Sequence, residues 1–446
     1  MSSEKFSGLW YGPLALVMAS AITILFFPGL MSYDSFNQYS QVLGLIPVNS
    51  AHPPIMVYLW KILYEIIPSP GSLLLFHQGI YWSAVAILAW SLASNTILRL
   101  GIFFIVGLWP PLLVNSVHLW KDVGMFVAVL LAGATLLADY RRPSWIWMVV
   151  SAVAIFYALA VRHNAIIGVP FLALLWAHRL ASRYPTAKKQ VIALCLIAPV
   201  FTLSIYGLTK WIDGPSSNGG LNSIILFDLA AISVSKNADM FPNSESRSGT
   251  DFFQRLKGAF KPEVNSPVGP VLSNIDFGES LPVYWLHTIR NNLQTYLQHR
   301  YYVFSKMMWI RGPDPYYPYH PGIDQNEYGI KFSYLEQEKS WDWRWFFDTL
   351  SHLFIYKPIL YLALSCILAI YSAFKLARDV RSFKWFATCT MSSSGIMMTI
   401  SLFFLSPAAD YRYAIWMITT TVLSLLLVIF LPNNEKTEQK ENSYSL

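Results

Sequence analysis

Long apolar runs recur through most of this 446-residue chain, and they constrain its fold more than any other feature. A helix needs about 20 mostly apolar residues to cross the hydrocarbon core of a bilayer. Ten runs approach that length, at about 9–30, 72–93, 97–114, 122–139, 144–161, 164–178, 190–211, 352–374, 385–407 and 414–432. The sequence therefore predicts an all-α polytopic membrane protein with about ten transmembrane helices and a mixed, mainly helical outer domain.

The composition agrees with this class. The hydrophobic fraction is 54%, the charged fraction is 13%, and the mean hydropathy is +0.41. Soluble domains carry roughly 25% charged residues, and disordered chains have low hydrophobicity. Soluble and disordered proteins are both excluded. Three cysteines, all within apolar runs, cannot form a disulfide scaffold.

Three of the predicted spans have alternatives. The first run could be a signal peptide, but no small-residue cleavage site follows it, so a retained anchor is expected. The fifth and sixth runs are separated only by Arg162-His163-Asn164. They form either two helices or one broken, re-entrant segment, which changes the helix count by one or two.

Basic loops predict the orientation. Three loops between apolar runs are rich in Arg and Lys, at 141–142, 179–189 and 375–384. With ten alternating spans, all three lie on the same side as both termini, and the positive-inside rule makes that side cytoplasmic. The chain has no Asn-X-Ser/Thr glycosylation acceptor, which favours a bacterial protein. A multi-pass protein of the bacterial cytoplasmic membrane is expected, with both termini in the cytoplasm.

This topology divides the chain into four parts. They are an N-terminal transmembrane domain (1–211) whose first outer loop is 31–71, an extracytoplasmic domain (212–351), C-terminal transmembrane helices (352–432) and a polar tail predicted to be disordered (433–446). The outer domain contains 12 Lys and Arg against 15 Asp and Glu. The basic excess therefore belongs to the membrane region and does not indicate nucleic-acid binding.

Within the outer domain, residues 281–309 have apolar side chains at helical spacing. We predict a polar side made of Arg290, Gln294, Gln298 and Arg300. Such a helix either lies in the membrane interface or covers the outer domain's own core. The two alternatives have about equal weight.

A proline- and aromatic-rich loop follows at 309–324. Its prolines restrict Tyr316, Tyr317 and Tyr319, and aromatic faces of this kind suit sugar rings. The alternative is an aromatic belt at the membrane surface.

The first outer loop carries an acid close to the predicted membrane surface. Asp34 lies a few residues beyond the first span, where a carboxylate is suited to act as a general base or a cation ligand. It is equally placed to cap a helix that starts with the spacing Phe36, Tyr39, Val42. His52 precedes two prolines and a second short helix, and the same membrane-edge cavity can hold both Asp34 and His52.

Cations recur at three other outer junctions, against the positive-inside tendency. Lys121 and Asp122 open the fourth span, Arg162 and His163 lie between the fifth and sixth, and Asp410 and Arg412 precede the last. An anionic lipid phosphate at the outer leaflet would explain them, because Arg and Lys bind phosphate oxygens well. The alternative is local pairing, for example of Arg412 with Asp410.

These features together resemble the GT-C superfamily of bacterial integral-membrane glycosyltransferases, most of all its less-studied bacterial members, which include those that decorate O-antigen or cell-wall polymers. The resemblance covers roughly 1–180 and 400–432. It is carried by SYDSFNQYSQ followed by AHPP in the first outer loop, and by WKD, VRHNA and DYRY at later junctions.

The resemblance implies sugar transfer from a polyprenyl-phosphate donor to a cell-envelope glycan or a lipid-linked acceptor. Asp34 would act on the acceptor or bind a divalent cation (Mg or Mn), with His52 beside it. The best-studied members often have two adjacent acids here, whereas this chain has Asp34-Ser35, which puts metal dependence in doubt. The expected lipid-phosphate contacts are Lys121, Arg162, His163 and Arg412. The expected sugar or acceptor contacts are Tyr33, Asn37, Gln38, Asp122, Tyr316 and Tyr317.

Two other functions remain open. A polymerase or ligase of lipid-linked glycans would use the same leaflet and similar arginines. A transporter would show two similar halves with charges at the bilayer midplane. No internal repeat is visible, and no Walker A motif indicates an ATP-driven pump.

Overall fold

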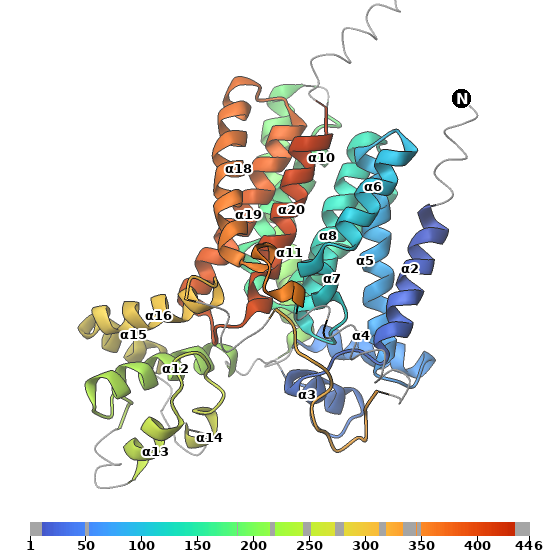
Figure 1. Cartoon of the computed structure of the whole chain (residues 1–446). Coiled ribbons are helices and arrows are strands. Elements are labelled where there is room, and N and C mark those ends of the chain that lie inside the picture. The colour runs from blue at the N-terminus through green and yellow to red at the C-terminus, as the bar shows by residue number, and fades with distance from the viewer. Residues whose placement is uncertain are drawn as a thin grey trace, which may run out of the picture.

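The structure is a computed structural model that describes residues 11–49, 53–184, 186–214, 219–243, 251–272, 281–311, 318–332, 345 and 349–432. Within these residues the chain is helical, and its only β-type pairing consists of isolated bridges. Helices run side by side in a bundle, and a layer of shorter helices lies across one end (Figure 1).

Six helices of the described residues are long and apolar enough to cross a membrane. They are α5 (Gly71–Leu92), α8 (Lys121–Arg141), α11 (Ala187–Asp213), α18 (Pro358–Arg378), α19 (Phe383–Leu405) and α20 (Ile415–Phe430) with the short η4 (Tyr411–Ala414) before it. A bent pair, α6 (Thr96–Gly107) and α7 (Pro110–Ser116), makes a possible seventh span. Three shorter apolar helices accompany them, α2 (Tyr11–Phe26), α9 (Trp145–Val161) and α10 (Val169–Ala181). The chain is a helical membrane protein, and ten crossings stay a prediction.

Prolines explain where the helices depart from the predicted runs. The run 97–114 is not one straight helix, because the chain bends by 60° between α6 and α7. Pro110 and Pro111 start α7, and proline cannot donate a helical hydrogen bond. At the other end of the pair, the side chain of Asn95 accepts hydrogen bonds from the first turn of α6.

Helices α9 and α10 form a hairpin that packs against α8. Its turn is the short helix η1 (His163–Ile167). Arg162 at the turn contacts Asp122 at the start of α8, whereas Arg179 near the end of α10 contacts Asp139 near the end of α8. The two helices therefore run in opposite directions along α8. The structure has two separate helices here.

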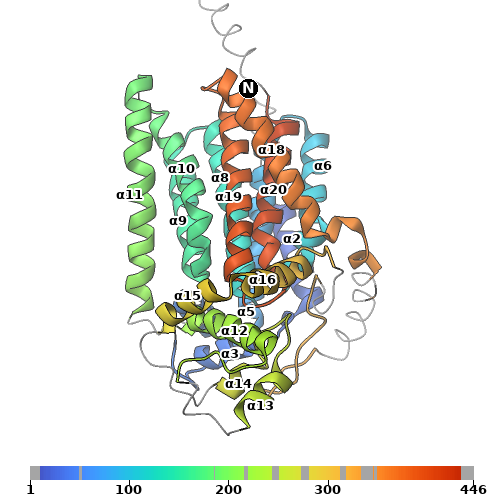
Figure 2. The same cartoon turned by 90° about the vertical axis from the view of Figure 1, so that its left-hand side faces the viewer.

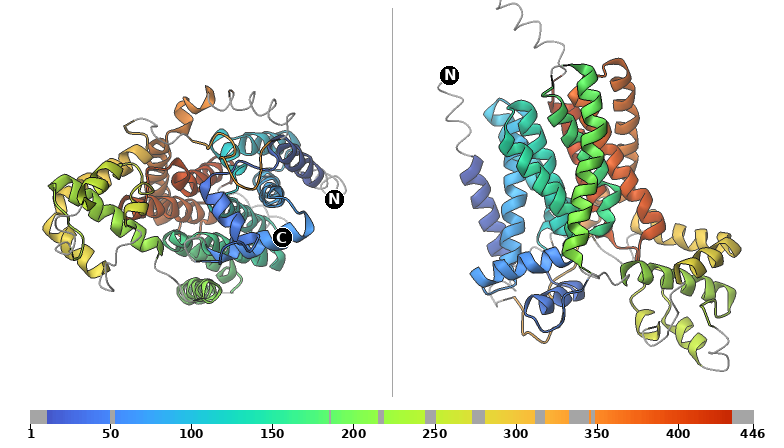
Figure 3. Two further views of the ribbon diagram at one scale, coloured as in Figure 1. Left: turned by 90° about the horizontal axis from the view of Figure 1, so that it is seen from below. Right: turned by 180° about the vertical axis from the view of Figure 1, so that it is seen from behind.

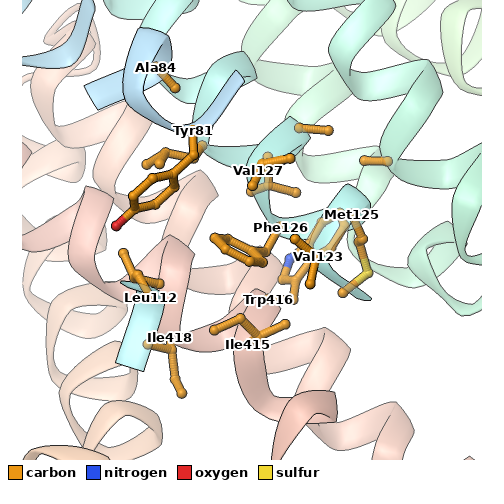
Figure 4. Packing of buried hydrophobic residues seen from close by; sticks show 14 of the residues in the cluster. Tyr81, Ala84, Leu112, Val123, Met125, Phe126, Val127, Ile415, Trp416 and Ile418 are labelled. Carbon is orange, nitrogen blue, oxygen red and sulfur yellow. The ribbon is translucent and has the colours of Figure 1, made fainter. Parts of the chain in front are cut away.

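The bundle core lies where α5, α7, α8 and α20 meet. Tyr81, Phe126 and Trp416 are fully buried there and are surrounded by aliphatic side chains (Figure 4). Gly168 lies so close to Trp416 that a Cβ atom on Gly168 would be 2.6 Å from the indole ring. Close packing of these side chains gives many dispersion contacts, which stabilise this arrangement.

The end of the bundle that carries the shorter helices is called the outer end below, because the topology prediction places it outside the cytoplasm. It carries α3 (Tyr33–Val42), α4 (Pro54–Ile66), α12 (Gly219–Lys236), α13 (Phe252–Ala259), α14 (Gly269–Leu272), α15 (Leu281–Asn291) and α16 (Leu293–Met307). Seen from below, α3 and α4 lie under the N-terminal helices while α12 to α16 project sideways (Figure 3). The described N- and C-terminal ends both lie at the opposite end (Figure 2).

Helices α12 to α16 enclose a small apolar core of their own. Ile225, Leu229, Phe241 and Leu256 are buried in it. Arg300, which we predicted on a polar surface, is instead fully buried. Its guanidinium donates to the Asp228 carboxylate at 2.6 Å and to a backbone carbonyl just beyond α19 at 2.7 Å. A buried charge requires such partners, and here the pair connects the outer layer to the bundle.

Residues 318–332 cross the first outer loop and hold it in place. The Met31 amide donates to the Gly322 carbonyl, and the Asp324 amide donates back to Met31. The Tyr33 amide, at the first turn of α3, donates to the Asp324 carboxylate at 3.1 Å. The start of α3 is therefore fixed by a segment about 290 residues away in sequence.

Candidate active site

Helix α3 presents Asp34 without using it as a cap. Ser32 is the N-cap residue, and the Ser35 hydroxyl accepts a hydrogen bond from the Ser32 amide at 3.3 Å. The prediction that Asp34 caps the helix is wrong, because serines on either side satisfy the helix terminus. The expected helical face is confirmed, since Phe36, Tyr39 and Val42 are all buried. The carboxylate of Asp34 is left to contact another element.

That contact is Arg412 of η4. One Arg412 Nη donates to Asp34 at 2.7 Å, and its Nε lies 2.8 Å from the Asp410 carboxylate. The Asp410 carboxylate also accepts the Arg412 backbone amide at 3.1 Å, which closes the first turn of η4. The acid and the base nominated separately from the first and last outer junctions thus form one ion pair.

A second layer of charge lies behind this pair. Asp122, at the start of α8, is almost completely buried and lies 2.7 Å from Arg162. Its other carboxylate oxygen is 3.9 Å from the Nε of Arg412. The local pairing considered from sequence is therefore present for Arg412 with Asp410, whereas Arg162 pairs with an acid 40 residues away. Arg162 is linked to the site through Asp122.

An open cavity of about 610 Å³ lies in front of these charges. Asp34, Lys121, Asp410 and Arg412 all line it, and residues 264–266 of the outer layer form the facing wall. Ligand cavities typically occupy about 300–1,000 Å³. The cavity combines three charged junctions of the chain with the outer layer, at the outer end of the bundle.

Trp120 forms an aromatic floor in this cavity. The Arg412 guanidinium lies 4.8 Å from the centre of its ring, and His118 stacks on the ring at 4.0 Å. The indole nitrogen donates to the Ser32 hydroxyl at 2.8 Å. A cation over an indole face is attracted by the ring electrons. Trp120 and the carboxylates of Asp34 and Asp410 therefore fix the position of the Arg412 guanidinium together.

His118 is a neutral, buried partner of this floor. The pKa of His118 is lowered to about 3, mainly by burial, with smaller contributions in the same direction from the neighbouring His320 and Arg412. Its Nδ1 lies 3.2 Å from the Asn115 carbonyl, and its Nε2 accepts the His320 amide at 3.0 Å. This pattern requires a proton on Nδ1. His118 therefore holds the loop 318–332 against the cavity.

Two residues of that loop were missed from sequence. His320 and Asp324 line the cavity, with the His320 Nε2 3.1 Å from the Asp324 carboxylate, and burial lowers the pKa of His320. We had expected this proline-rich loop to contribute Tyr316 and Tyr317. The signal that pointed to His320 and Asp324 was available, since His-Pro-Gly-Ile-Asp places two polar side chains four residues apart around a turn.

Most of the other predicted site residues lie elsewhere. His163 contacts Asp213 at the end of α11, at 3.1 Å, and does not line the cavity. Tyr33 lines it, whereas Asn37 and Gln38 do not. The Asn37 amide oxygen instead accepts a hydrogen bond from Gln41 within α3. His52, Tyr316 and Tyr317 lie outside the described residues.

The donor set around Asp34 does not fit a resident divalent cation. Among the residues that the structure describes, no group of three or more His, Cys, Asp or Glu side chains is placed to hold a metal ion. The Arg412 guanidinium contacts both the Asp34 and the Asp410 carboxylates, in the position that a cation between them would take. The mechanism below therefore uses no metal, and the cation stays a prediction.

Comparisons of the chain with protein-family models, with curated proteins and with solved structures found no match.

Proposed function

We propose that this protein is a glycosyltransferase that moves a sugar from a polyprenyl-phosphate donor to a cell-envelope glycan or lipid-linked acceptor. The reaction would occur on the outer side of the bacterial cytoplasmic membrane. One observation carries the proposal: Asp34 lines a cavity at the outer end of the bundle, and its carboxylate is paired with Arg412 and lies close to Lys121.

The cations of the cavity suit the phosphate of the donor. Arg412 presents a planar guanidinium, which matches phosphate oxygens in a two-point contact, and Lys121 adds a compact charge. Both lie where α8 and η4 begin, at the membrane edge, so a lipid-linked phosphate reaches them while its chain remains in the bilayer. A lipid-linked donor also requires neither a nucleotide-binding motif nor ATP.

Donor binding would prepare the base. In the structure the Asp34 carboxylate accepts a hydrogen bond from Arg412 and is therefore not available to accept a proton. A phosphate that binds Arg412 competes with Asp34 for the same guanidinium and releases the carboxylate toward the acceptor. The base would thus become available once the donor is present.

The reaction follows in one displacement. Asp34 removes the proton of an acceptor hydroxyl, and the acceptor oxygen forms a bond to the anomeric carbon. The bond between that carbon and the phosphate oxygen breaks, and polyprenyl phosphate leaves with the electron pair. Arg412 and Lys121 stabilise the charge that develops on the phosphate. A single displacement inverts the configuration at the anomeric carbon.

The distribution of charge disfavours the transport alternative. The cluster of paired charges lies at one end of the bundle, whereas transporters bind their substrates near the bilayer midplane. Its members are Asp34, Asp122, Asp410, Arg162 and Arg412. A polymerase or ligase would share the donor cations and differ in the acceptor, so the acceptor assay below separates it from a single-sugar transferase.

The test is sugar transfer by the purified chain. The protein would be reconstituted in vesicles with a panel of polyprenyl-phosphate sugars and crude envelope glycan as acceptor. We expect transfer by the wild type and a loss of at least about 100-fold in the Asp34→Asn variant, because general-base catalysis typically contributes that much. Products that gain one sugar indicate a transferase, and products that gain whole oligosaccharides indicate a polymerase or ligase.

Asp251→Asn is the matched control, because Asp251 is an exposed acid of the outer layer, does not line the cavity and pairs only at the surface with Arg255. Its activity should equal that of the wild type. Undiminished transfer by Asp34→Asn removes Asp34 from the role of base. No turnover with any donor refutes the proposed activity.

A further inference from the structure

Helices α15 and α16 carry an apolar stripe that nothing in the described chain covers. Successive members are three, seven, four and four residues apart, and the step of seven spans Arg290, so they lie on one side of the helix pair. Their exposed fractions are 70% for Val283, 60% for Leu286, 52% for Leu293, 39% for Leu297 and 47% for Tyr301. An extended exposed apolar surface of this kind usually marks an interaction site.

The opposite side of the same helices is already used. Leu281 and Trp285 belong to the small core of the outer layer, and the Trp285 indole donates to Asp228 of α12 at 3.0 Å. Both predicted alternatives for residues 281–309 therefore have support. One side of the pair covers the outer core, and a second apolar side faces away from it.

The position of the stripe relates it to the bilayer. Phe304 of α16 packs on Phe403 near the end of α19, with ring centres 5.4 Å apart, which places α16 at the level of the outer end of the bundle. From there α15 and α16 project sideways, and α12 lies on the side away from the bundle (Figures 1 and 3). Phe404, next to Phe403 on α19, is also an exposed apolar residue.

The charge of this segment fits an anionic surface. Residues 281–311 contain no Asp or Glu and four Arg and Lys, within an outer domain that is acidic as a whole. Arg300 is buried against Asp228, which leaves the other three cations to the surface of this segment. Arg290 lies in the stripe and is exposed, and Arg311 follows α16 on the surface. A long basic side chain can bury its stem in apolar surroundings while its charge reaches a phosphate headgroup.

We propose that the stripe of Val283, Leu286, Leu293, Leu297 and Tyr301 docks on the outer leaflet of the membrane, with the exposed cations Arg290 and Arg311 contacting anionic headgroups. The segment would act as an interfacial helix pair, which binds by burying apolar area and by electrostatic attraction. Since α12 of the same layer bears Ser223 of the cavity wall, docking would fix the height of the cavity relative to the lipid surface.

The experiment measures the depth of single nitroxide labels in the full chain. The three cysteines are first replaced by serine, and a new cysteine is placed by Leu286→Cys or Leu297→Cys on the stripe, or by Asn291→Cys or Gln298→Cys beside it. All four positions are exposed, so none of the substitutions disturbs the core. The labelled protein is placed in nanodiscs that hold one chain each.

We expect labels at 286 and 297 to collide more with oxygen than with a water-soluble nickel complex, and labels at 291 and 298 to show the reverse. Replacing phosphatidylglycerol by phosphatidylcholine should make the stripe labels shallower. Equal exposure of all four labels to the nickel complex overturns the proposal. The same labels would also be measured in vesicles that hold several chains each. If the stripe labels are protected from the nickel complex only in those vesicles, a second copy of the chain covers the stripe and the proposal is overturned.

Discussion

Arg412 organises the site at the scale of single residues. It contacts Asp34 at 2.7 Å, Asp410 at 2.8 Å and Asp122 at 3.9 Å. Asp34 and Arg412 were each predictable, because a charge beside an apolar run is conspicuous. Their contact was not, since 378 positions separate them and only the packed bundle brings them together. The role of Ser32 as the cap was also hidden, because Ser32 and Asp34 are equally suited to cap a helix.

The burial of His118 predicts a dependence of stability on pH. The pKa of His118 is lowered from 6.5 to about 3 in the folded chain. Between these values the unfolded chain binds a proton that the folded chain does not, so the free energy of unfolding falls as the pH falls. Its contribution is fully present above about pH 6.5, and roughly 2 kcal/mol is lost by pH 5. Thermal unfolding of the purified protein at pH 7.5 and pH 5 measures this loss.

The variant His118→Gln provides the comparison, because glutamine keeps a hydrogen-bonding amide and does not titrate. It should be less stable than the wild type at pH 7.5 and should lose less stability on acidification. Parallel pH profiles of the two proteins would show that His118 is not the titrating group.

At the scale of elements, apolar length predicted where most helices lie, because a membrane helix must be apolar over most of its length. Interruptions were harder to place. The Pro110-Pro111 pair bends one predicted run, and His163–Ile167 forms a separate turn. Arg300 was misplaced because helical spacing assigns a side chain to a face but does not reveal that a second helix covers that face.

Close packing between elements predicts the effect of one added methyl group. Gly168 precedes α10 and touches the buried Trp416 of α20, so Gly168→Ala forces the indole to shift. We expect a loss of about 1–3 kcal/mol in the free energy of unfolding, as for other overpacked cores. The control is Gly207→Ala within α11, where no atom lies within 4 Å of the added Cβ. That variant should gain up to about 1 kcal/mol from helix propensity. Thermal unfolding of both variants checks the difference, and an equal effect would refute the close contact.

At the scale of the whole molecule, the candidate site lies where the bundle meets its outer layer. Its walls come from α3, α8, η4, the start of α12 and the loop 318–332. Sequence identified the junctions, because each interrupts an apolar run. It did not identify the loop, because the pairing of Met31 and Tyr33 with Gly322 and Asp324 depends on backbone contacts between distant segments. Helix periodicity carries no information on such contacts.

The most direct test of this account is binding of polyprenyl phosphate to the purified protein, measured by native mass spectrometry beside uncharged polyprenol of the same length. We predict saturable binding that requires the phosphate. Lys121→Met should weaken it about tenfold or more, because a hydrogen bond to a charged group contributes at least about 1.5 kcal/mol. Lys257→Met, an exposed lysine of α13, should leave it unchanged. Equal affinity of the wild type for polyprenol, or unaltered binding by Lys121→Met, would contradict the assignment of this cavity to a lipid phosphate.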